Sequence, residues 1–270
     1  MGERLDKLLL LGEPEAVVAV AYSPKVTGEL ARRAWWAMPL ADNARRMLER
    51  ACVAEAPIGK VLADFLIEHL PFESDPHVMM DSVRIVLHPG LLDEATRLRL
   101  WNKASGNNAY YVPFLERVPD DLPGANAARA DWGALETSLA PLIARANPYA
   151  VTLARALSGS GQVFLGACEE VLRHLLNRDV ALAALNALAA YFSAVRFEGE
   201  SGEASAHEVL AILPALHDAV RAMQMLSRMD AETIRPILAR TTAEGTLMRK
   251  KLEPVIAPLL RQLAVLRGKD

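Results

Sequence analysis

Two arginine–tryptophan pairs in this sequence could bind a ligand through their side chains. Arg32 precedes Trp36 by four residues, and Arg97 precedes Trp101 by the same spacing. In a helix this spacing places each guanidinium one turn from its indole, where it could stack by a cation–π interaction and form a ligand platform. The alternative is that each tryptophan lies in the core between helices and the arginine stem covers it. We favour this packing interpretation, because most large aromatic side chains serve packing.

A third group of polar side chains follows Gly106. Asn107, Asn108, Tyr110 and Tyr111 bring four hydrogen-bonding side chains together, which a small polar pocket would require. The alternative, which we favour, is a helix cap followed by two tyrosines at the edge of the core. Asn108, Tyr110 and Tyr111 therefore join the two arginine–tryptophan pairs as candidate binding residues.

The sequence lacks the motifs that metal or nucleophilic catalysis requires. Glu170 and His174 lie one helical turn apart, but no HExxH or Glu-x-x-His motif occurs, and no serine, histidine and acid form a recognisable nucleophile motif. We therefore expect a protein that is not an enzyme and that holds no metal and no cofactor.

Cys52 and Cys168 belong to no CxxC or zinc-type cluster. We therefore expect both to be small buried hydrophobic residues, in a protein of a reducing compartment.

The charge balance argues against bulk electrostatic attraction to nucleic acid or to an anionic membrane. The net charge is −3, with 14 basic and 18 acidic residues before Gly124 and 16 against 15 from there on. The most apolar stretch, Val180 to Val195, is interrupted by polar residues and is shorter than the roughly 18 residues that suggest a membrane span. We expect no membrane insertion and, because the N-terminal run shows no signal-peptide cleavage site, a cytoplasmic protein.

The elements that position these residues are predicted to be helices throughout. Apolar residues recur at three- and four-residue spacing in nearly every segment, and proline-containing turns interrupt them at intervals of about one helical hairpin. The fold class is therefore all-α, with a helical-hairpin solenoid of the HEAT or armadillo kind packed on a bundle-like C-terminal part. The predicted division is residues 1–123 for the repeat-like subdomain, 124–132 for a linker and 133–270 for the C-terminal subdomain.

An internal duplication supports the solenoid prediction. The two copies share glutamate, arginine, tryptophan and asparagine at equal spacing. The pattern is Glu29, Arg32, Trp36 and Asn43 in the first copy and Glu94, Arg97, Trp101 and Asn108 in the second, 65 residues later. Each copy would hold several helices, which suits paired units of the HEAT or armadillo size.

Seven strings before Gly124 are long and unusual enough to suggest a family. They are KLLLLGEPEAVVAVAYSP from Lys7, ELARRAWWAM from Glu29, NARRMLER from Asn43, LPFE from Leu70, VLHPGLLDEATRLRLW from Val86, NAYYVPFL from Asn108 and PDDLP from Pro119. Together they resemble the DsrS family, soluble proteins encoded beside the reverse dissimilatory sulfite reductase genes of sulfur-oxidising bacteria. The resemblance implies an accessory or regulatory role in the oxidation of stored sulfur, and it supplies no catalytic residues.

The favoured hypothesis is thus a non-catalytic accessory protein of cytoplasmic sulfur oxidation that binds a protein of the sulfur-oxidation machinery. The alternative is an RNA-binding post-transcriptional regulator, since helical repeats can bind single strands, although the near-neutral charge argues against it. A small-ligand-binding protein or an enzyme is the least favoured. The protein-binding hypothesis predicts an exposed patch that includes residues such as Arg32, Arg97, Tyr110 or the methionines near the C-terminus.

Overall fold

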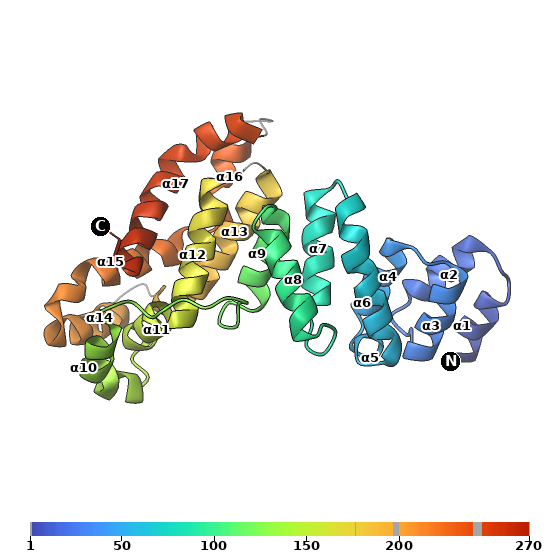
Figure 1. Ribbon diagram of the computed structural model, residues 1–270, viewed down its shortest axis with the longest axis horizontal. Helices are drawn as coiled ribbons and strands as arrows, with labels where there is room; N and C mark the ends of the chain where they lie inside the picture. The colour runs from blue at the N-terminus through green and yellow to red at the C-terminus, as the bar shows by residue number, and fades with distance from the viewer. Residues whose placement is uncertain (1, 176, 197–199, 240–244, 270) are drawn as a thin grey trace. The chain divides into compact units, whose positions relative to one another are not determined.

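The chain folds entirely into helices and the turns that join them. The computed structural model describes residues 2–175, 177–196, 200–239 and 245–269, and these contain seventeen α-helices, three 3-10 helices and no strand (Figure 1). The all-α prediction is confirmed. Packing divides the chain into two compact units, Met1–Pro113 (unit 1) and Phe114–Asp270 (unit 2). The division falls within a helix, whereas the predicted linker at 124–132 overlaps the non-helical segment 118–131.

Unit 1 consists of short helices. They are α1 (Gly2–Leu9), α2 (Pro14–Ala21), α3 (Gly28–Ala37), α4 (Ala41–Leu48), α5 (Ala51–Ala54), α6 (Pro57–His69), η1 (Leu70–Phe72), α7 (Pro76–Val86), α8 (Glu94–Ala104) and the first part of α9 (Asn108–Arg117). Pro14 and Pro57 occupy first-turn positions, where the missing N–H would have no helical partner. Thr27 and Asp93 cap α3 and α8 by accepting a backbone N–H.

α6 is the central helix of unit 1. It packs against α3, α4, α5 and α7, and its inner face buries Ile58, Leu62 and Leu66 at four-residue spacing (Figure 1). Because one face is committed to these neighbours, the opposite face carries the side chains that meet solvent.

The two copies of the predicted duplication fall on equivalent elements. The first copy covers α2, α3 and α4, and the second covers α7, α8 and α9. In both copies a proline follows the first helix, and the shared tryptophan lies near the end of the second helix. The pattern therefore marks matching helices in the same unit.

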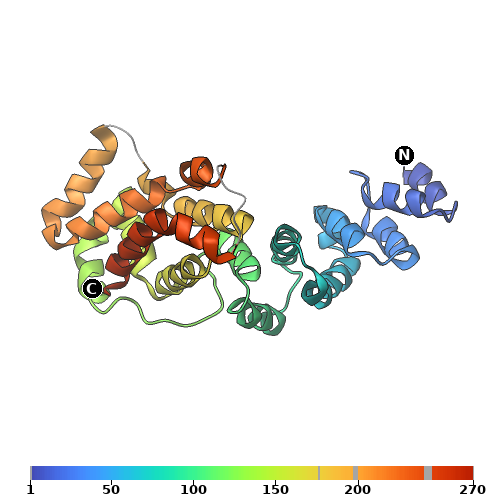
Figure 2. The same cartoon turned by 90° about the horizontal axis from the view of Figure 1, so that it is seen from above.

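Unit 2 contains the remaining helices. They are the rest of α9, α10 (Trp132–Ala144), α11 (Pro148–Leu157), α12 (Gly159–Arg173), α13 (Arg178–Tyr191), η2 (Ser193–Val195), α14 (Glu200–Ile212), η3 (Pro214–Leu216), α15 (His217–Arg228), α16 (Ala231–Ala239) and α17 (Gly245–Arg267). The core helices are α11, α12 and α13, and α17 packs along both α12 and α15 (Figure 1 and Figure 2). Met223 and Met248 are fully buried, so packing explains them.

Arg155, a half-buried residue of α11, connects several elements of unit 2. Its guanidinium donates to both Asp120 oxygens at 2.5 and 2.8 Å and to the Tyr191 carbonyl at 2.9 Å. It also lies 3.7 Å from the centroid of the Tyr191 ring, which stacks on Phe164 at 3.9 Å. This cluster ties the loop before α10 to α11, α12 and α13, and it has a structural role.

The two cysteines differ in environment. Cys168 is buried in α12, and burial raises the pKa of its thiol, which keeps it protonated. Cys52 is exposed in α5 and donates to the Val26 carbonyl at 3.3 Å. The prediction of a buried residue is confirmed for Cys168 and wrong for Cys52, because α5 is a single turn whose outer side faces water.

Candidate interaction site

Trp36 lies on the surface of unit 1. The residue is 87% exposed near the end of α3. The Arg32 guanidinium is held by Glu29, whose carboxylate accepts from Nε and Nη2 at 2.8 Å each. The hydrogen bonds to Arg32, followed by those to Arg33, lower the pKa of Glu29 to about 2. Because Trp36 is exposed, the packing interpretation is wrong for this residue. The predicted role of Arg32 as the cover of a buried tryptophan is wrong as well, and its guanidinium binds Glu29 instead.

Trp101, at the equivalent position of the second copy, is buried. It is 8% exposed, and its ring centroid lies 4.5 Å from that of Tyr111 in α9. Arg97 approaches Glu94 with an N–O distance of 4.0 Å. The packing interpretation is confirmed for Trp101.

The side chain available to cover the tryptophan differs between the copies. Tyr111 stands three positions after the shared asparagine of the second copy, and Arg46 stands at that position in the first. Tyr111 packs on Trp101, whereas the Arg46 guanidinium lies 5.2 Å from the centroid of the Tyr22 ring. The first copy thus has a cation at the position where the second has a ring that packs on its tryptophan.

Two of the polar side chains after Gly106, those of Asn107 and Tyr110, form hydrogen bonds within unit 1. Tyr110 is buried, donates to the Leu70 carbonyl at 3.0 Å, and has its pKa raised by burial. Asn107 accepts from the backbone N–H of Ala109 at 3.0 Å at the start of α9, and Asn108 is half-buried. The helix-cap interpretation is confirmed for Asn107. The seven candidate residues therefore lie in different settings: Arg32 and Trp36 are exposed, whereas Trp101 and Tyr110 are buried.

A ladder of stacked rings runs along the outside of α6. Trp35 meets Phe65 edge-on at 4.7 Å, Phe65 stacks on His69 at 5.6 Å with an interplanar angle of 11°, and His69 lies 6.0 Å from Phe72. Trp35, Phe65 and His69 are half-buried, whereas Phe72 is 81% exposed. We call these four residues the aromatic ladder. Its rings pack against one another and leave one side available to solvent.

Two carboxylates share the helix face that carries the ladder. Val61, Asp64, Phe65, Glu68 and His69 follow three- and four-residue spacing, so they occupy one face of α6. Val61 is 49% exposed, and Asp64 and Glu68 are both exposed. We call Asp64 and Glu68 the acidic rim. Acidic and apolar side chains therefore alternate along the outer face of α6.

Arg33 of α3, the helix that contributes Trp35 to the ladder, is already engaged in ion pairs. It pairs with Glu29 at 2.8 Å and with Asp6 at 3.2 Å. Within the described ranges, neither carboxylate of the acidic rim forms an ion pair. The rim therefore keeps its negative charge uncompensated beside the ladder.

Sequence reasoning named none of the four ladder residues as candidate binding residues. Phe65, His69 and Phe72 follow one another at spacings of four and three, which a search for outward-facing aromatic positions on the predicted helix could have found. The contact between Trp35 and Phe65 joins α3 to α6, and only the folded structure brings these residues together.

Large exposed apolar residues concentrate in unit 1. Eight of the eleven such residues in the described chain lie there: Leu10, Leu11, Tyr22, Trp36, Leu40, Val61, Phe72 and Leu98. Unit 2, although longer, has Val151, Ile212 and Leu247. The surface feature that departs most from an ordinary solvated face therefore belongs to unit 1.

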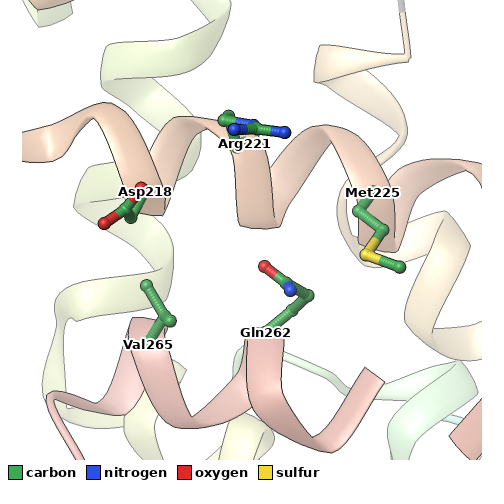
Figure 3. A pocket seen from close by; sticks show the side chains of 5 residues that line it. All are labelled: Asp218, Arg221, Met225, Gln262 and Val265. Atoms are coloured by element: carbon green, nitrogen blue, oxygen red, sulfur yellow. The ribbon is translucent and has the colours of Figure 1, made fainter. Parts of the chain in front are cut away.

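Unit 2 contains a shallow cavity of about 450 Å³ between α15 and α17. Figure 3 shows Asp218, Arg221 and Met225 on α15 and Gln262 and Val265 on α17, with the Gln262 amide directed toward α15. Asp218 and Arg221 are exposed, and Asp218 lies 3.3 Å from His217. The lining offers hydrogen bonds to a small polar molecule but brings no nucleophile and base together.

The described part of the chain has neither a metal-binding cluster nor a helix able to span a membrane. No group of three or more His, Cys, Asp or Glu residues is placed to hold a metal ion in the described ranges. In that same part of the chain, every helix is too short or too polar to cross a membrane.

Comparison with known proteins adds no relative. A scan of protein-family models matches no family, and searches of curated proteins and of solved structures find no match. The functional interpretation therefore depends on the surface of the chain itself.

Proposed function

We propose that this chain is a non-catalytic protein-binding module and that the surface around Trp36 and the aromatic ladder is its docking site. The observation that supports the proposal is the exposure of two large rings: Phe72 (81%), whose ring lies 6.0 Å from that of His69 in the ladder, and Trp36 (87%), which follows the ladder residue Trp35 in α3. Tryptophan is enriched among the residues that dominate binding energy at interfaces. A large aromatic residue left in water gains most when a partner covers it.

The energy available from such covering is sufficient for specific association. Burial of one tryptophan or phenylalanine removes roughly 150–250 Å² from water at about 25 cal/mol per Å², or on the order of 4–6 kcal/mol per ring before the costs of association. Trp36 and Phe72 together therefore supply a hydrophobic anchor, and the half-buried rings between α3 and α6 hold part of that surface rigid. A rigid surface loses little conformational entropy on binding.

The biological setting of the proposal comes from the resemblance to the DsrS family. In that setting the module is cytoplasmic, acts as an accessory or regulatory protein of sulfur oxidation, and binds a protein of the sulfur-oxidation machinery. The helical-hairpin repeat of unit 1 is part of the same proposal, because repeats of this kind commonly present extended binding surfaces.

RNA is the competing ligand, because exposed aromatic rings can stack on bases. The acidic rim argues against it, since phosphate groups approaching the ladder would meet Asp64 and Glu68. A protein partner is therefore the better match to this face.

The test is an affinity pull-down from an extract of sulfur-oxidising cells, with proteins and RNA identified in the same eluate. Three baits are compared: the wild-type chain, Trp36→Ser/Phe72→Ser, and Leu98→Ser, which removes an exposed apolar residue elsewhere in unit 1. We expect a sulfur-oxidation protein to bind the wild type and the Leu98→Ser control but not the double variant. Equal capture by all three baits, or ladder-dependent capture of RNA alone, would refute the proposal. Circular dichroism of each bait verifies the fold.

A further inference from the structure

We infer that the segment recognised by the aromatic ladder is cationic as well as apolar, and that Asp64 and Glu68 select its charge. The inference rests on the proposed docking function and adds the chemistry of the partner: a protein segment in which lysine or arginine accompanies apolar side chains.

The first argument is placement. Asp64 and Glu68 alternate with Val61, Phe65 and His69 on the outer face of α6, so a segment that covers the rings also comes within reach of both carboxylates. A lysine or arginine could pair with a carboxylate while its stem packs on a ring, or stack on a ring by a cation–π interaction. One partner side chain can thus use both features of the face.

The second argument is that the acidic rim is electrostatically unfavourable in the free chain. Asp64 and Glu68 are four residues apart, a spacing at which like charges repel. Glu68 also lies in the last turn of α6, where the helix dipole disfavours a negative charge. A cationic partner would relieve both effects.

The third argument excludes the other occupants. An acidic segment or a nucleic acid would bring negative charge against the rim. A second copy of this chain, docked face to face through the ladder, would place two acidic rims in one symmetric interface. A cationic segment of another protein is the occupant whose charge complements the face.

The experiment selects a random peptide library, displayed on phage, against the immobilised full chain. Enriched peptides are synthesised, and their Kd values are measured by fluorescence anisotropy with four proteins: wild type, Trp36→Ser/Phe72→Ser, Asp64→Asn/Glu68→Gln and Glu15→Gln/Glu55→Gln. The last variant is the matched control, because it makes the same change in net charge at exposed acidic residues outside the face.

We expect peptides whose binding requires Trp36 and Phe72 to carry lysine or arginine beside apolar residues. The Asp64→Asn/Glu68→Gln variant should weaken them about three- to tenfold, as two exposed charge pairs would, and should reduce the salt dependence of binding. The Glu15→Gln/Glu55→Gln control should bind as the wild type does.

Two outcomes would overturn the inference, and they are distinguishable. If the ladder-dependent peptides lack positive charge, or bind the Asp64→Asn/Glu68→Gln variant unchanged, the cationic partner is wrong while the docking site stands. If no enriched peptide depends on Trp36 and Phe72, the inference fails together with the proposed function.

Discussion

Trp36 and Trp101 occupy equivalent positions in the two copies of the duplicated pattern, yet one is 87% exposed and the other 8%. The helices that carry them, α3 and α8, are similar in length and follow similar caps. The next helix differs as well: Tyr111 packs on Trp101 in the second copy, whereas Arg46, at the same position of the first copy, lies over the Tyr22 ring. The comparison shows that the same spacing of arginine and tryptophan can place the tryptophan in the core or on the surface, and it predicts that the side chain at position 46 or 111 contributes to the difference.

The largest expected effect contrasts the two tryptophans directly. Trp101→Ala should lower the free energy of unfolding by about 3–5 kcal/mol, because it empties a buried site. Trp36→Ala should change it by less than about 0.5 kcal/mol, because the residue makes little packing contact. Denaturant titrations of both variants measure the difference. Equal destabilisation would contradict the assignment of one residue to the core and the other to the surface.

The second prediction removes the cover of the second copy. Tyr111→Arg gives the second copy the residue that the first copy has at the matching position. It should lower the free energy of unfolding by about 1–3 kcal/mol, because the contact between the Tyr111 and Trp101 rings is lost. Trp101 should then become accessible to acrylamide, a collisional quencher of indole fluorescence. Quenching that stays at the wild-type level would show that another group covers the ring.

The third prediction concerns the hydrogen bond from Tyr110 to Leu70. Tyr110→Phe leaves the Leu70 carbonyl without this donor and should lower stability by about 1 kcal/mol. Tyr22→Phe, on the exposed side of the first copy, should change stability by less than about 0.5 kcal/mol and serves as the control. Thermal unfolding of both proteins provides the comparison.

The fourth prediction supplies the missing cover to the first copy. Arg46→Tyr places an aromatic side chain at the position of Tyr111, and the change in stability should stay within about 1 kcal/mol, because a ring contact replaces the cation–π contact with Tyr22. We expect Trp36 to become less accessible to acrylamide and ladder-dependent peptides to bind more weakly. Unchanged quenching of Trp36 would mean that more than one residue separates the two copies.

The smallest effect concerns the ion pairs of α3. The pKa of Glu29 is lowered from 4.5 to about 2 by hydrogen bonds with Arg32 and Arg33. The pKa of Glu29 is lower in the folded chain than in the unfolded chain. The ion pairs therefore contribute their full stabilisation of the folded state above pH 4.5, and this stabilisation is lost as the pH falls toward 2. NMR titration of the Glu29 carboxyl carbon should give a midpoint near 2, and Arg32→Gln should move it upward. A midpoint near 4.5 in the wild type would contradict these ion pairs.

Much of the secondary structure could be predicted from the sequence. Apolar spacing and proline positions predicted helices, and the duplicated residues marked matching elements in α2–α4 and α7–α9. Pro254 and Pro258 lie four residues apart, a spacing that predicts a kink or a restart of the last helix. α17 does not restart at either proline but runs from Gly245 to Arg267 through both. Buried Leu252, Ile256 and Leu259 pack along neighbouring helices, and this packing outweighs the lost backbone hydrogen bonds.

The candidate site could be predicted only in part. Arg32 and Trp36 were recognised, but whether they are exposed depends on the packing of α3 against other helices, which the spacing of residues within α3 does not contain. The contrast between NARR from Asn43 and NAYY from Asn108 was present in the sequence and marked a difference between the two copies. The ladder itself needed the packing of α3 on α6, because Trp35 and Phe65 are distant in the chain.

The most direct test of the central claim is ¹⁹F NMR of the chain labelled with 5-fluorotryptophan. The four resonances are assigned with single Trp→Phe variants, and the solvent isotope shift between H2O and D2O reports the exposure of each ring. The account predicts the largest shift for Trp36 and a near-zero shift for Trp101. Equal shifts at the two positions would contradict it, because the first copy would then offer a partner no more aromatic surface than the second.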